Sequence, residues 1–349
     1  MKQRNRQFLF VLFCSLFFLN ILASRAQAGD ANAAFKSGET YYGKGQYEKA
    51  LTEYNKAIQF NSGFAKAYFK RGRTYDKLNM VDKAISDYTK AIEHSSQYVD
   101  AYFNRAVLYA EKKLYDKAID DYSKVIKMNP DDPDAYFNRA ISYAATGQMD
   151  LAIADYTVQV KINPKDAQSY NNRGLQYVKK GQVDKGIKDY TKAVEIDPKY
   201  ARAFNNRGLA YEKKKMMDKA IADYTKAAQV DPKYVNAHLN LGYVYLEAKL
   251  YDKAVAAYTK ALKLEPDDAD SYYNRALANY NLKNYAKAVS DYSAALKIDP
   301  KDSSAFNNRG LCYQRMGKKN EAVADFKKAA DLGNTKAPGN LKDYYNIDY

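Results

Sequence analysis

Residues 99–132 read VDAYFNRAVLYAEKKLYDKAIDDYSKVIKMNPDD, and residues 133–166 read PDAYFNRAISYAATGQMDLAIADYTVQVKINPKD. The two stretches carry aromatic, small and charged residues at the same places, so the chain repeats itself every 34 residues. A fixed period of this length indicates a repeat architecture and not a single globular core. Nine such repeats fit between residues 31 and 336, and positions 1 to 34 below are counted within each repeat.

Small residues occupy two positions of every repeat. Position 8 holds only Gly or Ala, and position 20 holds Ala except at Gly186. Position 24 is Tyr in the first eight repeats and Phe326 in the ninth. Positions 4, 8 and 11 share one face of a helix, and positions 20, 24 and 27 share one face of a second helix. Each repeat therefore predicts two antiparallel helices, whose axes approach at the small residues while rings fill the space beside them.

The end of each repeat is marked by proline in six cases, at position 32, where a helix cannot continue. Position for position, the pattern resembles the tetratricopeptide repeat (TPR), which has an aromatic at 4, Gly or Ala at 8, Tyr at 11, Ala at 20, Phe or Tyr at 24, Ala at 27 and Pro at 32. The resemblance implies an all-α fold, a right-handed α-solenoid superhelix of tandem helix-turn-helix TPR repeats, with first helices lining a concave groove.

The expected organisation has three parts. A secretory signal peptide covers residues 1–28, nine repeats cover residues 29–336, and a C-terminal capping helix and tail cover residues 337–349. The cap is expected because a terminal repeat otherwise exposes its core. The repeats are 31–64, 65–98, 99–132, 133–166, 167–200, 201–234, 235–268, 269–302 and 303–336.

Arginine and aspartate vary together inside the repeats. Seven repeats have Arg at position 7 and Asp at position 23, whereas the seventh has Leu241 and Ala257. Loss of both charges at once predicts a contact between them. Pairing with the preceding repeat would leave Asp223 and Arg275 without partners, so we expect structural salt bridges inside each repeat, partly buried. The pairs are Arg71 and Asp87, Arg105 and Asp121, Arg139 and Asp155, Arg173 and Asp189, Arg207 and Asp223, Arg275 and Asp291, and Arg309 and Asp325.

Asparagine recurs at position 6, one of the positions that face the groove in the family. An Asn amide can bond both the C=O and the N–H of an extended peptide, whatever the sequence of that peptide. This row of asparagines at position 6, the asparagine ladder, resembles the one in the repeat domain of O-linked N-acetylglucosamine transferases. The alternative is that the amides bond a neighbouring helix, and both roles can coexist. The expected peptide-binding groove is Asn104, Asn138, Asn172, Asn206, Asn240, Asn274, Asn308, Lys66, Lys70, Phe103 and Phe137.

Lysine residues near the start of the repeats add a charge preference. Lys66 and Lys70, at positions 2 and 6, resemble half of the carboxylate clamp of chaperone-binding TPR adaptors, but Lys36 stands where that clamp has Asn. An acidic ligand is expected there more than a captured C-terminal carboxylate. The net charge of +15, which falls to +11 when four basic leader residues are removed, agrees with acidic partners.

The first 28 residues have the organisation of a signal peptide. Three basic residues precede an apolar run over residues 8–19, and Ala26 and Ala28 stand where signal peptidase reads small residues. We expect cleavage before Gly29 and export, with the periplasm of a Gram-negative bacterium as the first choice. An uncleaved inner-membrane anchor and secretion are the alternatives. The anchor is disfavoured because the apolar segment falls short of the roughly 20 residues that a membrane span needs.

Residue types required for catalysis are sparse and far apart. His94 and His238 belong to different repeats and cannot meet in a solenoid, so no triad or metal site is expected, and no phosphate loop is present. Cys312 at position 10 is expected to be a packed residue, and no cofactor or small-molecule substrate is expected. Nucleic-acid binding is disfavoured because acidic residues interleave most of the lysines.

These patterns predict a non-enzymatic scaffold that binds protein or peptide partners in its groove, in envelope assembly or regulation. Two alternatives stay open: a self-assembling structural protein, and a regulatory subunit of an envelope enzyme. Contact with a membrane is expected only through an uncleaved leader.

Overall fold

The computed structural model describes residues 28–349, so residues 1–27 of the expected leader lie outside the described part. Within residues 28–349 every regular element is a helix. None of these helices is long and apolar enough to cross a membrane. The chain divides into two compact units, Met1–Pro164 and Lys165–Tyr349, and each is described by itself.

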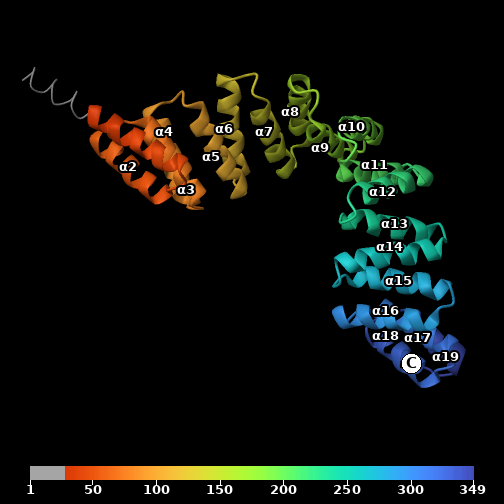
Figure 1. The fold of residues 1–349 in the computed structure, drawn as a ribbon. Coiled ribbons are helices and arrows are strands. Elements are labelled where there is room, and N and C mark those ends of the chain that lie inside the picture. The colour runs from red at the N-terminus through yellow and green to blue at the C-terminus, as the bar shows by residue number, and fades with distance from the viewer. Residues whose placement is uncertain (1–27) are drawn as a thin grey trace, which may run out of the picture. The chain divides into compact units, whose positions relative to one another are not determined.

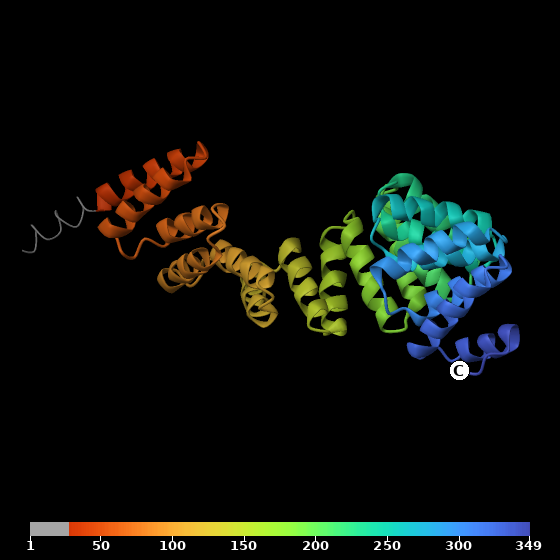
Figure 2. The same ribbon diagram turned by 90° about the horizontal axis from the view of Figure 1, so that it is seen from below.

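The described part of the first unit is a run of helical hairpins. It begins with a helix over residues 28–43. There follow α2 (Tyr47–Phe60), α3 (Ala65–Lys77), α4 (Val81–His94), α5 (Val99–Glu111), α6 (Tyr115–Met128), α7 (Pro133–Ala145) and α8 (Met149–Ile162). In Figures 1 and 2 each helix lies beside its neighbours in the chain, as expected for repeats that pack only on adjacent repeats.

The second unit continues the same alternation. Its helices are α9 (Ala167–Lys179), α10 (Val183–Ile196), α11 (Ala201–Lys213), α12 (Met217–Val230), α13 (Val235–Glu247), α14 (Tyr251–Leu264), α15 (Ala269–Asn281), α16 (Tyr285–Ile298), α17 (Ser303–Arg315), α18 (Lys319–Asp331) and α19 (Ala337–Tyr345). Below, the odd-numbered helices α3 to α17 and the helix over residues 28–43 are called first helices, and α2 to α18 with even numbers are called second helices.

Turns inside the repeats share one backbone conformation. Position 15 is left-handed in every repeat, whether it is a glycine such as Gly147 (φ 78°) or a lysine such as Lys113 (φ 59°). A left-handed residue ends a helix and satisfies its last carbonyls, which explains why the first helices stop there. Where position 34 is aspartate, its carboxylate caps the next first helix; Asp132, for example, accepts hydrogen bonds from the backbone N–H groups of Asp134 and Ala135.

The core of each repeat is a ring placed against a small residue. Tyr224 of α12 is fully buried, and a Cβ added to Gly208 of α11 would stand 2.6 Å from its ring. Similar contacts join Gly72 to Tyr88 and Gly310 to Phe326. The expectation that small residues permit close approach of the two helices is confirmed, because a side chain at position 8 would displace the ring.

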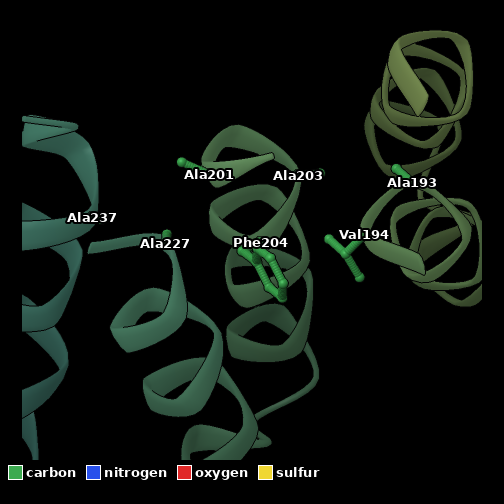
Figure 3. Close-up of a cluster of buried hydrophobic side chains, with 7 residues drawn as sticks. All are labelled: Ala193, Val194, Ala201, Ala203, Phe204, Ala227 and Ala237. Carbon is green, nitrogen blue, oxygen red and sulfur yellow. The ribbon is translucent and has the colours of Figure 1, made fainter. Parts of the chain in front are cut away.

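Packing between repeats uses a second set of small residues, at position 3 of each repeat. Position 3 of the first helix is Ala or Ser, and from the second repeat onward it is almost fully buried, as at Ala203 and Ala237. Figure 3 shows one such interface, in which Phe204 of α11 and Val194 of α10 lie between their helices. Every repeat therefore contributes one apolar surface to each of its neighbours.

Helix α19 covers the last repeat. Asn334, which replaces the proline at position 32, accepts hydrogen bonds from the backbone N–H groups of Lys336 and Ala337 and so caps this helix. Ala337 and Leu341 are fully buried in one cluster with Phe326 of α18. The apolar face of the ninth repeat is closed in this way.

Candidate functional site

The seven expected Arg–Asp pairs lie inside their own repeats. In each, the arginine Nε and one Nη donate to the two carboxylate oxygens of the aspartate over 2.6 to 3.0 Å, as Arg139 does to Asp155. This two-point geometry is the strongest form of an Arg–carboxylate contact. The side chain of Asp155 is 8% exposed and that of Arg139 is 16% exposed, so water reaches only the edge of the pair.

Each guanidinium is held by more than its aspartate. That of Arg139 lies over the rings of Tyr136 and Tyr143, at 5.7 and 5.6 Å from their centroids. Its remaining Nη donates to the Ser123 hydroxyl of the preceding repeat at 2.9 Å. The same bond recurs in other repeats, and the acceptors are Asn55, Thr89, Ser123, Thr191, Thr259 and Ser293.

We call this arrangement the arginine socket: the rings at positions 4 and 11, the Asp at position 23, and the polar residue at position 25 of the preceding repeat. The bond to position 25 crosses from one repeat to the next, so the socket joins neighbours as well as the two helices of one repeat. Position 25 was not singled out from the sequence, although its hydroxyl residues recur with the same period.

Burial and charge act in opposite directions on these groups. Burial would lower the pKa of the Arg139 guanidinium, but the hydrogen bonds and charge of Asp155 hold that pKa above its ordinary value. For Asp87, burial raises the pKa of the carboxyl, and Arg71 only partly offsets this. Each charge is therefore acceptable only while its partner is present.

The eighth and seventh repeats depart from the socket in different ways. In the eighth, Asn279 replaces the ring at position 11 and donates a hydrogen bond to Asp291 at 3.3 Å. In the seventh, Leu241 and Ala257 replace both charges and pack together in one buried cluster with Tyr224. The double replacement thus exchanges an ion pair for an apolar contact.

Asparagines at position 6 follow a rule that depends on the preceding repeat. Asn206 donates to the Oδ1 atom of Asn171 at 2.9 Å, and Asn240 donates to the Oδ1 atom of Asn205 at 2.8 Å. Asn308 donates to the Tyr273 hydroxyl at 2.8 Å. In all three cases the acceptor stands at position 5 of the preceding repeat. These amides fix neighbouring first helices to each other, which is the role that the sequence left open beside peptide contact.

Other amides of the ladder have no such acceptor in front of them. Position 5 before Asn104 and Asn138 is phenylalanine, and these two amides turn back to the carbonyls of Asp100 and Asp134 on their own helices. Asn274 follows Leu239 and makes no side-chain hydrogen bond with any residue that the structure describes. Asn172 accepts a hydrogen bond from Asn171 at 3.2 Å. Asn104, Asn138 and Asn274 are thus the amides best able to bind a ligand.

A pocket of about 530 Å³ opens where three first helices meet, and we call it the groove pocket. Its lining comes from positions 2, 5, 6 and 9 together with one ring at position 34: Phe35, Glu39, Lys66, Phe69, Lys70, Arg73, Tyr98, Asp100 and Asn104. The expected groove residues Lys66, Lys70 and Asn104 are therefore brought together. Lys70 pairs with Glu39 at 2.6 Å, and Glu39 also accepts a hydrogen bond from the Tyr54 hydroxyl.

Cations of the groove pocket differ in what they contact. Lys66 is exposed and has no ion pair within residues 28–349. Arg73 lies over the Tyr42 ring, at 5.6 Å from its centroid, and likewise forms no salt bridge with a described residue. Lys66 and Arg73 are therefore available to a ligand carboxylate, whereas Lys70 is already neutralised by Glu39.

Phenylalanines at position 5 serve the core of the repeat. Phe103 packs edge-on against Tyr122 with 5.6 Å between ring centroids, and Phe137 does the same against Tyr156 at 6.0 Å. Both remain partly exposed. They can offer an edge to a ligand without leaving their contacts.

The two histidines and the described cysteine make packing contacts or are buried. His94 stacks on Tyr68 at 5.4 Å, and the Nε2 of buried His238 lies 3.0 Å from the carbonyl oxygen of Pro232. Cys312 is fully buried, and burial raises the pKa of its thiol to about 12. No group of three or more His, Cys, Asp or Glu side chains suited to a metal ion occurs among residues 28–349.

This fold and this site define an all-α repeat protein with a pocket between its first helices. Models of the tetratricopeptide repeat match residues 65–98, 99–132, 122–154, 201–234, 239–303 and 303–332, and a TPR repeat model matches residues 38–79 and 174–215. The chain belongs to the tetratricopeptide-repeat family, whose members are generally non-catalytic scaffolds for protein–protein interaction. No protein with a curated description matches the sequence.

Several solved structures resemble parts of the chain. YrrB, described as a TPR protein with an unusual peptide-binding site, is 26% identical with a TM-score of 0.48, over 53% of this chain and 95% of that one. MamA is 26% identical with a TM-score of 0.46, over 46% and 95%. A TPR protein from Parabacteroides merdae ATCC 43184 is 21% identical with a TM-score of 0.49, over 68% and 94%.

Proposed function

We propose that this protein is a non-catalytic scaffold that binds acidic, extended segments of partner proteins along its first helices, starting in the groove pocket. The observation that carries the proposal is the pocket itself. It places two cations without salt-bridge partners, Lys66 and Arg73, beside the amide of Asn104 and the exposed edge of an aromatic cluster.

The chemistry of these groups suits a peptide. Lys66 and Arg73 can pair with carboxylates, Arg73 in two-point fashion. The Asn104 amide can leave its own helix carbonyl and bond a peptide backbone at little cost, because the exchanged bond lies at the surface. Phe35 and Tyr98 offer apolar area for a side chain. A ligand with two carboxylates, one for Lys66 and one for Arg73, fits this set, since Lys70 is already paired with Glu39.

Charge reversal tests the groove pocket directly. The probe is a fluorescent peptide of alternating Glu and Phe, and its anisotropy is titrated with protein at low salt. Changing Lys66→Glu with Arg73→Glu is expected to weaken binding at least about tenfold. Lys199→Glu with Lys233→Glu makes the same change in net charge at exposed turns outside the pocket, and it should weaken binding by less than about threefold. Equal losses for the two double variants would refute the assignment.

Asparagine variants test whether the amides hydrogen-bond the backbone of a bound peptide. Asn104→Ala with Asn138→Ala should weaken the same peptide by about threefold or more while leaving thermal stability nearly unchanged. If the affinity is unchanged, Asn104 and Asn138 do not contact the peptide, and only the cations remain in the proposed site.

We also propose that the protein works outside the cytoplasm, in the periplasm, in envelope assembly or regulation. Support comes from the basic start, the apolar run over residues 8–19 and the small residues Ala26 and Ala28. Cell fractionation with N-terminal sequencing of the native protein tests this. A soluble envelope form that begins at Gly29 is expected, whereas a membrane-bound form that keeps the leader would favour the anchor.

A further inference from the structure

The arginine socket of the seventh repeat lacks both of its charged residues, and it shares no residue with the groove pocket. Six repeats place a guanidinium between two rings, beside an aspartate and near a polar residue of the preceding repeat, and in the eighth repeat Asn279 replaces one of the rings. In the seventh repeat the rings His238 and Tyr245 and the polar residue Thr225 remain, but Leu241 and Ala257 bring neither charge. A pocket of about 320 Å³ opens there between α12, α13 and α14, and we call it the seventh-repeat pocket.

Its lining differs in kind from that of equivalent pockets. The pocket of the fifth repeat contains Arg173 and Asp189, and that of the eighth contains Arg275 and Asp291. The seventh-repeat pocket has no acidic side chain in its lining. Leu241 and Ala257 form its floor, and both are more than nine-tenths buried. An apolar floor between two rings accepts a flat apolar group.

One polar group of the pocket has lost its usual partner. Hydroxyls at position 25 donate to the carbonyl four residues earlier and accept from the arginine of the next repeat, as Thr191 and Thr259 do. Thr225 makes neither bond with any described residue; the second is impossible because Leu241 stands where the arginine would be. Its hydroxyl is left available at the side of the pocket.

Charge at the mouth selects the occupant. Lys253 and Lys260 line the pocket, are exposed, and form no salt bridge with a residue that the structure describes. Two lysines without a carboxylate repel an incoming arginine, although a guanidinium is what fills this place in the other repeats. They attract carboxylates beside an uncharged ring.

We propose that the seventh-repeat pocket binds a partner protein through one aromatic side chain flanked by acidic residues. The ring enters between His238 and Tyr245 over Leu241, and the flanking carboxylates pair with Lys253 and Lys260. This surface is formed mainly on the second-helix side, so it would hold a different segment, or a different partner, from that in the groove pocket.

Refilling the socket is the test. The double change Leu241→Arg with Ala257→Asp introduces the Arg and Asp that seven of the other eight repeats have, and it leaves the net charge unchanged. All measurements use the Lys66→Glu, Arg73→Glu background, so that the groove pocket cannot contribute. The probe is acetyl-Glu-Glu-Phe-Glu-Glu-amide, followed by saturation-transfer NMR on the peptide, with thermal denaturation as the check of folding.

Saturable binding with Kd below about 1 mM is expected for the background protein. The double change Leu241→Arg with Ala257→Asp should weaken peptide binding at least about tenfold. The peptide with Ala in place of Phe should bind the background protein more weakly by a similar factor. Lys253→Gln with Lys260→Gln, which changes only exposed side chains, should weaken binding about threefold or more, and less so at high salt.

Three outcomes would overturn the proposal: no saturable binding, equal affinity of the refilled protein, or equal affinity of the Ala peptide. Sedimentation of the background protein tests whether a second copy of this chain occupies the pocket instead. If it self-associates and the refilled variant does not, then a second copy of this chain fills the pocket, and the proposal of a separate partner is wrong.

Discussion

Asn206 donates a hydrogen bond from its side-chain nitrogen to the Oδ1 of Asn171, which is 1% exposed and belongs to the preceding repeat. The acceptor has no water to replace this donor. Removal of the donor therefore leaves a buried oxygen unsatisfied, whereas the same change at a free amide of the ladder leaves nothing behind.

Asn206→Ala is accordingly expected to lower the free energy of unfolding by about 1–3 kcal/mol. Asn274→Ala, at the same position of a repeat that follows Leu239, should change it by less than about 0.5 kcal/mol. Chemical denaturation of the two variants measures the difference. Equal effects would contradict the rule that position 6 bonds position 5 of the preceding repeat.

The Arg139–Asp155 pair should be far more costly to break than to delete. Arg139→Leu leaves the buried Asp155 unpaired and should destabilise the protein by about 3 kcal/mol, the lower end for a buried pair because Arg139 stays 16% exposed. Adding Asp155→Ala reproduces the natural pair of the seventh repeat and should recover at least about half of the loss. Thermal denaturation of the single and double variants decides, and identical midpoints would refute the coupling.

Gly186 is the glycine among the alanines at position 20, and its neighbours explain why. A Cβ there would stand 2.4 Å from Val178 Cγ2 and 2.9 Å from the carbonyl oxygen of Gly174. Gly186→Ala should destabilise by about 1–3 kcal/mol, despite the better helix propensity of alanine. Val178→Ala in the same chain should restore part of this but not all, since the carbonyl contact persists. A stabilising Gly186→Ala would show that the two helices can separate.

Cys312 should behave as a reporter of unfolding. Burial raises the pKa of its thiol to about 12, and the nearby charge of Asp325 acts in the same direction. At pH 8 a thiol reagent should therefore react at the rate of opening of the last repeats, and quickly once denaturant is added. Fast reaction of the folded protein, at the rate of a free thiol, would contradict the buried position.

Alkaline pH should destabilise the protein through its buried tyrosines. Burial raises the pKa of Tyr98 to about 12, and it likewise raises the pKa of Tyr122 and other rings at position 24 above the ordinary value. A raised pKa in the folded state means stability that is complete below the unfolded value of about 10 and is lost as pH rises through the folded value. Chemical denaturation at pH 8 and pH 11 measures this loss in the free energy of unfolding. Tyr122→Phe should make the loss between the two pH values smaller.

Much of this structure could be predicted from the period of 34 residues. Gly208 facing Tyr224 could be expected because each lies on the predicted packing face of its helix, and the two helices of one repeat pack against each other. The pairing of Arg139 with Asp155 could be inferred because Leu241 and Ala257 change together. Both inferences use residues of one repeat, whose relative position the helix-turn-helix geometry determines.

Contacts between repeats were harder to predict from the sequence. The role of Asn206 depends on Asn171, and the same residue type at Asn104 turns to its own helix because Phe69 offers no acceptor. Distances across the interface decide this, and spacing within a repeat does not reveal them. For the same reason neither the bond from Arg139 to Ser123 nor the seventh-repeat pocket was foreseen.

Helix α19 imitates the beginning of another repeat. Asn340 donates to the Oδ1 of Asn307 at 2.8 Å, which is the bond that Asn206 and Asn240 make to the repeats before them, and Ala337 and Leu341 fill the apolar surface. The end of the array thus copies part of an internal junction. Gene duplication could lengthen such a protein one module at a time without inventing a new terminus, and a protein engineer could insert a copy of residues 303–336 ahead of α19 by the same logic.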